Sequence, residues 1–177
     1  QLPLTVTAHH PNARLTVVND DALRVTTVPG IPTKLVANLP YNISVPVLIH
    51  LLECFSPVRT ALVMVQAEVG RRLAASPGTK DYGGPSVKAA WFGSWRTVGA
   101  VSRRVFWPVP HVDSVLVAFE RHVVDTGDEA LREKTFELVD AAFRQRRKML
   151  RQSLAALVVG SDAASDHVRA AGLDPTA

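Results

Sequence analysis

The sequence is poor in features that would place it outside a cell or in a membrane. Its 177 residues include one cysteine, Cys54, so no disulfide bond can form within the chain. A single cysteine suits a reducing compartment, and we expect a cytoplasmic protein. No apolar run approaches the roughly 20 residues that span a bilayer. The residues after Gln1 also lack the charged-then-apolar pattern of a secretory signal.

Metal and cofactor motifs are missing as well. The six histidines and Cys54 show no metal-ligand spacing, which excludes a zinc site. No glycine-rich string of the G-x-G-x-x-G kind occurs before Asn38. An open α/β sheet that binds a nucleotide-like cofactor usually carries such a turn after its first strand. We therefore expect either that the chain is a fragment or that it lacks the usual cofactor turn.

What the sequence does contain is an ordinary globular composition with unevenly distributed charge. Hydrophobic residues make up 47% and charged residues 20%, which suits one domain with at most a small appendage. The net charge of +4 is modest, but the cations are clustered, and acidic residues gather upstream of the largest cluster. One side of the molecule is therefore predicted to face a polyanion. The clustered cations are Arg71, Arg72, Arg103, Arg104, Arg144, Arg146, Arg147, Lys148 and Arg151.

Apolar runs alternate with helical patterns through most of the chain. Strands are predicted near residues 15–18, 34–38, 60–66, 98–105 and 112–120, and helices near 44–55, 67–75 and 86–92. The run 34–38 shows no alternation, so this strand is expected to be covered on both faces. Ser44 is predicted to cap the helix that follows it. The order of elements predicts an open α/β sheet with an antiparallel edge.

From Asp128 onward the pattern is wholly helical. Gly160 ends a predicted long helix, and a further helix is expected over residues 162–171. We place the boundary near residues 122–128, with an α/β domain over 1–124 and a small all-α domain over 125–177. The long helix is predicted from one apolar stripe that comprises Phe136, Val139, Phe143, Leu150, Leu154 and Leu157.

The string Asn38-Leu39-Pro40-Tyr41 stands at the end of a predicted strand, where ligands of open α/β sheets bind. The Asn38 side-chain oxygen and a backbone carbonyl of Leu39 or Pro40 can accept hydrogen bonds from both N–H groups of a ring amine. The Tyr41 ring can stack on the face of the same ring. The structural alternative is a turn that caps the next helix.

This string resembles motif IV of the S-adenosylmethionine-dependent adenine-N6 methyltransferases. Its longer form, residues 38–44, is similar to that of the rRNA adenine N6,N6-dimethyltransferase family (KsgA/RsmA type). Further blocks occur in the family's order at residues 19–23, 65–73, 82–87, 106–114 and 143–154. The resemblance implies part of a Rossmann-like S-adenosylmethionine-dependent methyltransferase fold, followed by a small helical rRNA-binding domain.

The resemblance also implies an activity. It is the transfer of two methyl groups from S-adenosylmethionine to N6 of adenines in small-subunit (16S) rRNA during ribosome biogenesis. The implied partner is small-subunit rRNA or a ribosomal subunit precursor, for an enzyme that is a monomer. In the family, loss of the methylation is linked to kasugamycin resistance. The implied site residues are Asn38, Leu39, Pro40, Tyr41 and Phe106 for catalysis, with Tyr41 and Phe106 on either side of the target adenine, and Asp21, Ala22 and Asn38 for the cofactor.

Basic side chains are the predicted RNA contacts. On a helical projection, one face beside the apolar stripe carries Arg144, Arg147, Lys148 and Arg151, which suits a track for phosphates. Arg146 lies on the other flank of the stripe. Glu68 is expected to form an ion pair with a nearby arginine. The side chains of Trp91, Trp95 and Trp107 are expected to pack in the interior. The predicted RNA contacts are Arg103, Arg104, Arg144, Arg147, Lys148 and Arg151.

Two parts of the family's pattern have no counterpart in the sequence: the glycine-rich first motif and the acid that binds ribose. The family places both before the position of Gln1. We therefore expect that about the first third of the protein is absent, that the helical domain is incomplete, and that this chain alone binds the cofactor poorly or not at all. Two alternatives stay open. One is a large-subunit rRNA methyltransferase of the erythromycin-resistance type, and the other is a non-catalytic RNA-binding module for ribosome assembly.

Overall fold

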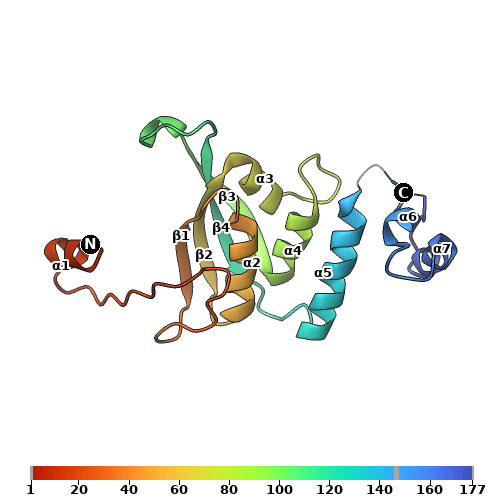
Figure 1. Ribbon diagram of the computed structural model, residues 1–177, viewed down its shortest axis with the longest axis horizontal. Helices are drawn as coiled ribbons and strands as arrows, with labels where there is room; N and C mark the ends of the chain where they lie inside the picture. The colour runs from red at the N-terminus through yellow and green to blue at the C-terminus, as the bar shows by residue number, and fades with distance from the viewer. Residues whose placement is uncertain (1, 146–147, 177) are drawn as a thin grey trace.

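The computed structural model describes residues 2–145 and 148–176. A sheet with helices on one side forms the body of the molecule, and α6 and α7 lie beyond α5 at one end (Figure 1). The elements are α1 (Leu2–His9), β1 (Lys34–Asn38), α2 (Ser44–Cys54), β2 (Thr60–Gln66), α3 (Ala67–Leu73), α4 (Gly84–Phe92), β3 (Gly93–Val101), the 3-10 turn η1 (Arg103–Val105), β4 (Ser114–Arg121), α5 (Glu129–Arg144), α6 (Leu150–Leu154) and α7 (Ser161–Ala170).

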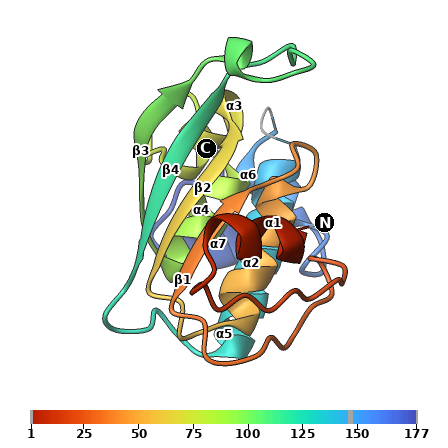
Figure 2. The same ribbon diagram turned by 90° about the vertical axis from the view of Figure 1, so that its left-hand side faces the viewer.

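Among the described residues, four strands form one sheet in the order β1-β2-β4-β3 (Figure 2). Strand β1 runs parallel to β2, whereas β4 is antiparallel to both β2 and β3. Helix α2 makes the crossover between the parallel strands, because two parallel neighbours cannot be joined by a tight turn. The predicted open α/β sheet with an antiparallel edge is confirmed.

The core lies between the sheet and helices α2, α3 and α4. Successive side chains of a strand point to opposite faces, so every second residue of β2 and β4 faces these helices. Val63 and Val117 are fully buried there, and they belong to the same cluster as Leu48 of α2, which is 0% exposed. Burial of each such side chain stabilises the fold by about 1.5–3 kcal/mol.

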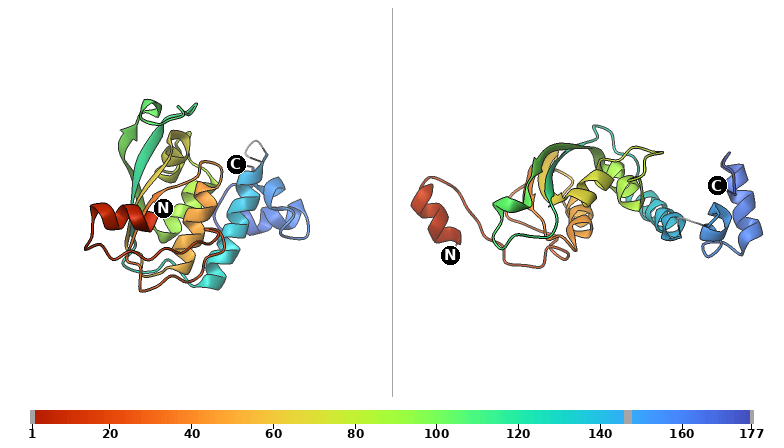
Figure 3. Two further views of the ribbon diagram at one scale, coloured as in Figure 1. Left: turned by 60° about the vertical axis from the view of Figure 1, so that its left-hand side comes forward. Right: turned by 90° about the horizontal axis from the view of Figure 1, so that it is seen from above.

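The opposite face of the sheet is open in the part of the chain that the structure describes. Val36 of β1 is 77% exposed, and Leu62 of β2 is 39% exposed. The reason is that α2, α3 and α4 all lie on the other side (Figures 2 and 3). The expectation that residues 34–38 are covered on both faces is therefore wrong for this structure.

Residues 10–33 form an extended connection and not a strand. Leu15, Val17 and Val18 are exposed, and residues 15–18 have no ladder partner among the described residues. A strand is stable only when a neighbour pairs with it, so the β-branched composition alone was insufficient. The connection is held where His50 Nε2 of α2 donates a hydrogen bond to the Val25 carbonyl at 2.9 Å, and at its end, where the Arg59 N–H donates to the Thr33 carbonyl at 2.9 Å.

Two predicted element starts need correction. Ser44 does not cap α2: the N-cap residue is Ile43, and Ser44 is the first helical residue, buried, with its hydroxyl 3.5 Å from the Tyr41 carbonyl. The strand predicted over 98–105 begins at Gly93 and ends at Val101. It begins early because Trp95 lies against Phe119 of β4, with ring centroids 4.6 Å apart, and this pairing outweighs the glycine and polar residues around it.

The single long helix predicted after Asp128 is also wrong. Helix α5 ends at Arg144, and α6 begins at Leu150. Phe136 and Phe143 of α5 face Trp91 and Tyr82, each at 6.1 Å between ring centroids, whereas α6 packs against both α5 and α7. Arg144 and Lys148 carry like charges four residues apart, a spacing that disfavours continuation of the helix.

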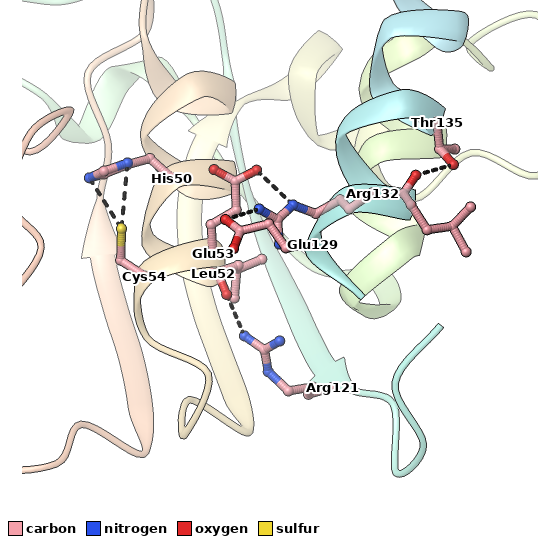
Figure 4. Close-up of polar contacts among 9 residues, drawn as sticks. His50, Leu52, Glu53, Cys54, Arg121, Glu129, Arg132 and Thr135 are labelled. Carbon is pink, nitrogen blue, oxygen red and sulfur yellow. Dashed lines mark hydrogen bonds and ion pairs between the residues drawn. The ribbon is translucent and has the colours of Figure 1, made fainter. Parts of the chain in front are cut away.

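Charged side chains join α5 to the body of the molecule (Figure 4). Arg132 of α5 lies 3.3 Å from Glu53 of α2 and 3.3 Å from Glu129 of its own helix. Lys88 of α4 lies 2.7 Å from Asp140 of α5. Since α5 thus packs against the α/β layer while α6 and α7 lie further out (Figure 3), the division at residue 124 stays a prediction.

Candidate functional site

A hollow of about 450 Å³ lies at the carboxyl end of β1, beneath the connection between β3 and β4. This connection starts and ends beside Gln66, because Val101 and Ser114 pair with each other and Ser114 pairs with Gln66. The hollow therefore occupies the position where open α/β sheets bind their ligands. Its lining comprises Asn38, Leu39, Pro40, Tyr41, Phe106, Trp107, Pro108 and Pro110.

Leu39 anchors the wall that β1 contributes. Its side chain is 6% exposed and belongs to the core cluster, and its N–H donates a hydrogen bond to the Met64 carbonyl at 3.1 Å. Because neighbouring side chains of an extended segment point in opposite directions, Asn38 and Pro40 are exposed at the hollow. Among the described residues, none hydrogen-bonds to the Asn38 side-chain amide, which is therefore open to a ligand.

Tyr41 and Phe106 are brought together although 64 residues separate them in the sequence. The Tyr41 and Ser114 hydroxyls share a hydrogen bond of 2.9 Å, and Ser114 is fully buried at the start of β4. This bond fixes the half-buried Tyr41 ring on one wall, while the half-buried Phe106 lies on the wall formed by the β3–β4 connection. The site thus combines two half-buried aromatic side chains, Tyr41 and Phe106, with one open amide.

The β3–β4 connection is itself held in place. The Asp113 carboxylate accepts a hydrogen bond from the Arg103 N–H at 2.9 Å, and the Asp113 carbonyl accepts one from the Ala67 N–H at 2.9 Å. The Arg103 guanidinium also donates to the His111 carbonyl at 3.2 Å. Phe106 therefore follows a braced turn.

The predicted cofactor residues lie elsewhere. Asp21 and Ala22 are exposed in the extended connection and are not among the residues that line the hollow. The Asp21 carboxylate accepts a hydrogen bond from the Leu23 N–H at 2.9 Å and lies 3.7 Å from Arg24. It therefore stabilises a local turn, and the structure does not bring it to Asn38.

The predicted RNA contacts are distributed over two regions. Arg103 and Arg104 are exposed in η1, directly before Phe106. Arg144 ends α5, whereas Lys148 precedes α6 and Arg151 lies within it, so these three do not share one helical face as predicted. Arg147 and Arg146 lie outside the described residues.

Three sequence-based expectations about packing have different outcomes. Glu68 does pair with a nearby arginine, at 2.7 Å from Arg72. Trp91 and Trp95 do pack against other aromatic rings. Trp107 does not: it is 94% exposed, at the rim of the hollow. Its neighbours in sequence are apolar, so composition could not distinguish it from the two packed tryptophans.

We also searched the described residues for a metal site, a membrane-spanning helix and a cysteine nucleophile. They contain no group of three or more histidine, cysteine or acidic side chains placed to hold a metal ion. Nor do they contain a helix long and apolar enough to cross a membrane. The Cys54 thiol lies 3.7 Å from His50 (Figure 4), but burial and then the Glu53 carboxylate raise its pKa, so it remains a protonated thiol and a poor nucleophile.

The sheet order and the hollow at the carboxyl end of β1 agree with the Rossmann-like methyltransferase fold of two solved structures. A crystal structure of a dimethyladenosine transferase from Plasmodium falciparum has the same fold, with a TM-score of 0.73 at 24% identity over 94% of this chain and 57% of that chain. A crystal structure of the 23S rRNA methyltransferase ErmE gives a TM-score of 0.64 at 28% identity, over 98% of this chain and 68% of that chain. The family model for ribosomal RNA adenine dimethylase matches residues 3–173, and the chain belongs to this family.

Curated relatives agree with the family. Ribosomal RNA small subunit methyltransferase A of Leifsonia xyli subsp. xyli (strain CTCB07) is 62% identical over 99% of this chain and 63% of its own length. The protein of the same name from Nocardia farcinica (strain IFM 10152) is 56% identical over 99% of this chain and 62% of its length. The chain thus spans somewhat less than two thirds of the relatives it matches.

Sequence reasoning missed one residue that shapes the hollow. Ser114 lies in the block at residues 106–114 that resembles the family, but nothing in the sequence pairs its hydroxyl with Tyr41 across 73 positions. A buried serine at the first position of an apolar strand is the signal that could have identified it, since a buried hydroxyl needs a hydrogen-bond partner.

Proposed function

We propose that this chain supplies the target-base side of an S-adenosylmethionine-dependent rRNA adenine-N6,N6 dimethyltransferase that acts on small-subunit (16S) rRNA during ribosome biogenesis. The observation that carries the proposal is the hollow in which Asn38, Tyr41 and Phe106 meet. Membership of the ribosomal RNA adenine dimethylase family and the names of the relatives support it.

The proposed mechanism begins with the extruded adenine. The ring enters between Tyr41 and Phe106, and stacking on such side chains stabilises a bound base by about 1–3 kcal/mol. The Asn38 side-chain oxygen and the Pro40 carbonyl then accept hydrogen bonds from the two N–H groups of the N6 amine. Because these bonds draw the nitrogen lone pair out of conjugation with the ring, N6 becomes a better nucleophile. Positioning supplies most of the acceleration.

The residues assigned to the methyl donor, S-adenosylmethionine, fit their proposed role less well than those assigned to the target base. The resemblance assigns the cofactor to Asp21, Ala22 and Asn38, but the Asp21 carboxylate already accepts from Leu23 N–H and does not line the hollow. The described residues therefore do not by themselves enclose S-adenosylmethionine. When bound, the cofactor supplies an electrophilic methyl group, and the steps proposed for this chain concern the target base alone.

For the RNA strand we propose contacts on both groups of predicted cations. Arg103 and Arg104 stand beside the hollow and suit the phosphates next to the target nucleotide. Arg144, Arg147, Lys148 and Arg151 suit a second contact further along the RNA.

The test is a methylation assay with the full-length protein and purified small and large ribosomal subunits, none of which carries the modification beforehand. We expect methyl groups on adenine N6 of the small subunit. Activity on the large subunit alone would contradict the proposal and favour the erythromycin-resistance type, to which the likeness to ErmE also points. Binding without any methyl transfer would favour the non-catalytic assembly module.

Substitutions at Tyr41 separate the ring from the hydroxyl. Tyr41→Ala is expected to lower kcat/KM by an amount equivalent to about 1–3 kcal/mol, because a stacking face is lost. Tyr41→Phe keeps the ring but leaves the buried Ser114 hydroxyl unpaired, so it should cost about 1 kcal/mol in the free energy of unfolding and less in activity. The Tyr41→Phe/Ser114→Ala double variant serves as the control, since it removes both hydroxyls. Equal losses of activity in the Ala and Phe variants would contradict the stacking role.

A further inference from the structure

The β3–β4 connection carries an exposed apolar tip. Trp107 is 94% exposed, and Val105 and Val109 beside it are also exposed. In Figures 1 and 2 this connection projects beyond the end of the sheet, away from the helices. An indole in such a position contributes almost nothing to the core, and together with the two exposed valines it forms an apolar patch of the kind that marks interaction sites.

The tip is held in an ordered conformation. Phe106 N–H donates a hydrogen bond to the Arg103 carbonyl at 3.3 Å, and Val105 N–H donates to the Ser102 carbonyl at 3.1 Å. Asp113 braces the base of the same turn through its bond to Arg103 N–H, and Pro108 restricts the backbone immediately after the indole. Trp107 therefore needs little ordering when a ligand binds, which reduces the entropic cost of binding.

The surroundings indicate what the ligand is. Trp107 lines the rim of the hollow that contains Tyr41 and Phe106, and the exposed cations Arg103 and Arg104 precede it in the same connection. The Asp113 carboxylate is occupied by the Arg103 N–H. A flat apolar ring next to cations, at the mouth of an aromatic hollow, combines stacking with phosphate attraction, and a single-stranded nucleic acid requires both.

We propose that Trp107 is a stacking platform for the unpaired nucleobase that neighbours the target adenine in the RNA strand. The inference rests on the proposed function, and it adds a second base site outside the hollow. With its neighbour stacked on Trp107, the strand is bent at the rim, so the target base alone enters between Tyr41 and Phe106. Trp107 is thus a positioning residue and not a catalytic one.

The test compares Trp107→Ala, Trp107→Phe and the unchanged full-length protein. The probe is a short fluorescein-labelled single-stranded RNA with one adenine among uridines, and a second probe has an abasic site next to the adenine. We expect Trp107→Ala to weaken binding roughly 5- to 100-fold, whereas Trp107→Phe keeps most of the affinity. The unchanged protein should bind the abasic probe more weakly than the intact probe. Trp107→Ala should bind the two probes with equal affinity. Val159→Ala, which alters an exposed apolar side chain in the segment after α6, is the matched control and should change nothing.

A second readout separates positioning from structure. Stacking should quench the fluorescence of Trp107, and methylation by Trp107→Ala should show a raised KM with kcat nearly unchanged. If the unchanged protein methylates rRNA and Trp107→Ala has the same RNA affinity and the same KM as the unchanged protein, this inference is overturned and the proposed function stands. If Trp107 binds RNA as expected but no subunit is methylated, the proposed function fails instead. Quenching by vesicles of an anionic phospholipid and not by RNA would also overturn the inference.

Discussion

Replacement of Asn38 by alanine in the full-length protein is expected to lower methyl transfer to adenine N6 at least about 10²-fold. The Asn38 side-chain oxygen is the acceptor proposed to hold the target amine, and its amide is open at the hollow. Alanine removes the acceptor but leaves Leu39, which anchors this wall in the core. Binding of rRNA should therefore persist, because the cations proposed to contact the RNA backbone are untouched. The measurements are methyl incorporation into small subunits and the Kd for rRNA.

The control for this prediction is Asn38→Asp, which keeps an acceptor oxygen at the same position. It should retain more activity than Asn38→Ala, since the N6 amine still finds one partner. An alanine variant with normal kcat would contradict the role proposed for Asn38. A variant that loses rRNA binding together with activity would point to a folding defect, which far-UV circular dichroism detects.

Gly93→Ala is expected to destabilise the protein by about 3 kcal/mol or more. A Cβ at this position would overlap the Glu120 carbonyl oxygen, the Phe119 ring and the Arg121 Cα, which belong to the paired strand β4. Two of these atoms are backbone, so no side-chain rotation can relieve the overlap, and the β3–β4 ladder must separate at its first pair. Urea unfolding followed by circular dichroism measures the loss as a lowered midpoint.

Gly99→Ala in the same strand is the matched control. Its Cβ would meet only the Leu116 side chain, at 3.6 and 4.0 Å, which is ordinary van der Waals contact. We expect its unfolding midpoint to lie close to that of the unchanged protein. Similar midpoints for the two glycine variants would show that strand propensity, and not steric overlap, governs this strand.

Much of the fold could be predicted from local patterns. The strands at 34–38, 60–66 and 112–120 and the helices after Ser44 and Ala67 were identified because apolar periodicity reflects burial against a neighbour in this structure. Both failures arose because an apolar pattern does not show which neighbouring element will pack against it. Residues 15–18 have a strand-like composition without a ladder partner among the described residues, and the stripe from Phe136 to Leu157 has the period of one helix but is divided between α5 and α6.

The candidate site was predicted in part. The order of Asn38, Leu39, Pro40 and Tyr41 at a strand end indicated a ligand position, and the resemblance added Phe106; the structure places all five at one hollow. What could not be predicted is which apolar residues remain outside. Trp107 and Trp95 look alike in the sequence, and only the tertiary arrangement leaves one exposed and the other against Phe119.

The position of Leu39 links the hollow to the motions of the sheet. Its N–H is bonded to the Met64 carbonyl and its side chain is held in the core, so the wall that carries Asn38 cannot shift unless the β1–β2 pair opens. Exchange of the Leu39 amide hydrogen with solvent therefore reports directly on how often the wall comes apart. Because β1 is an edge strand in this structure, that opening needs the loss of one ladder only.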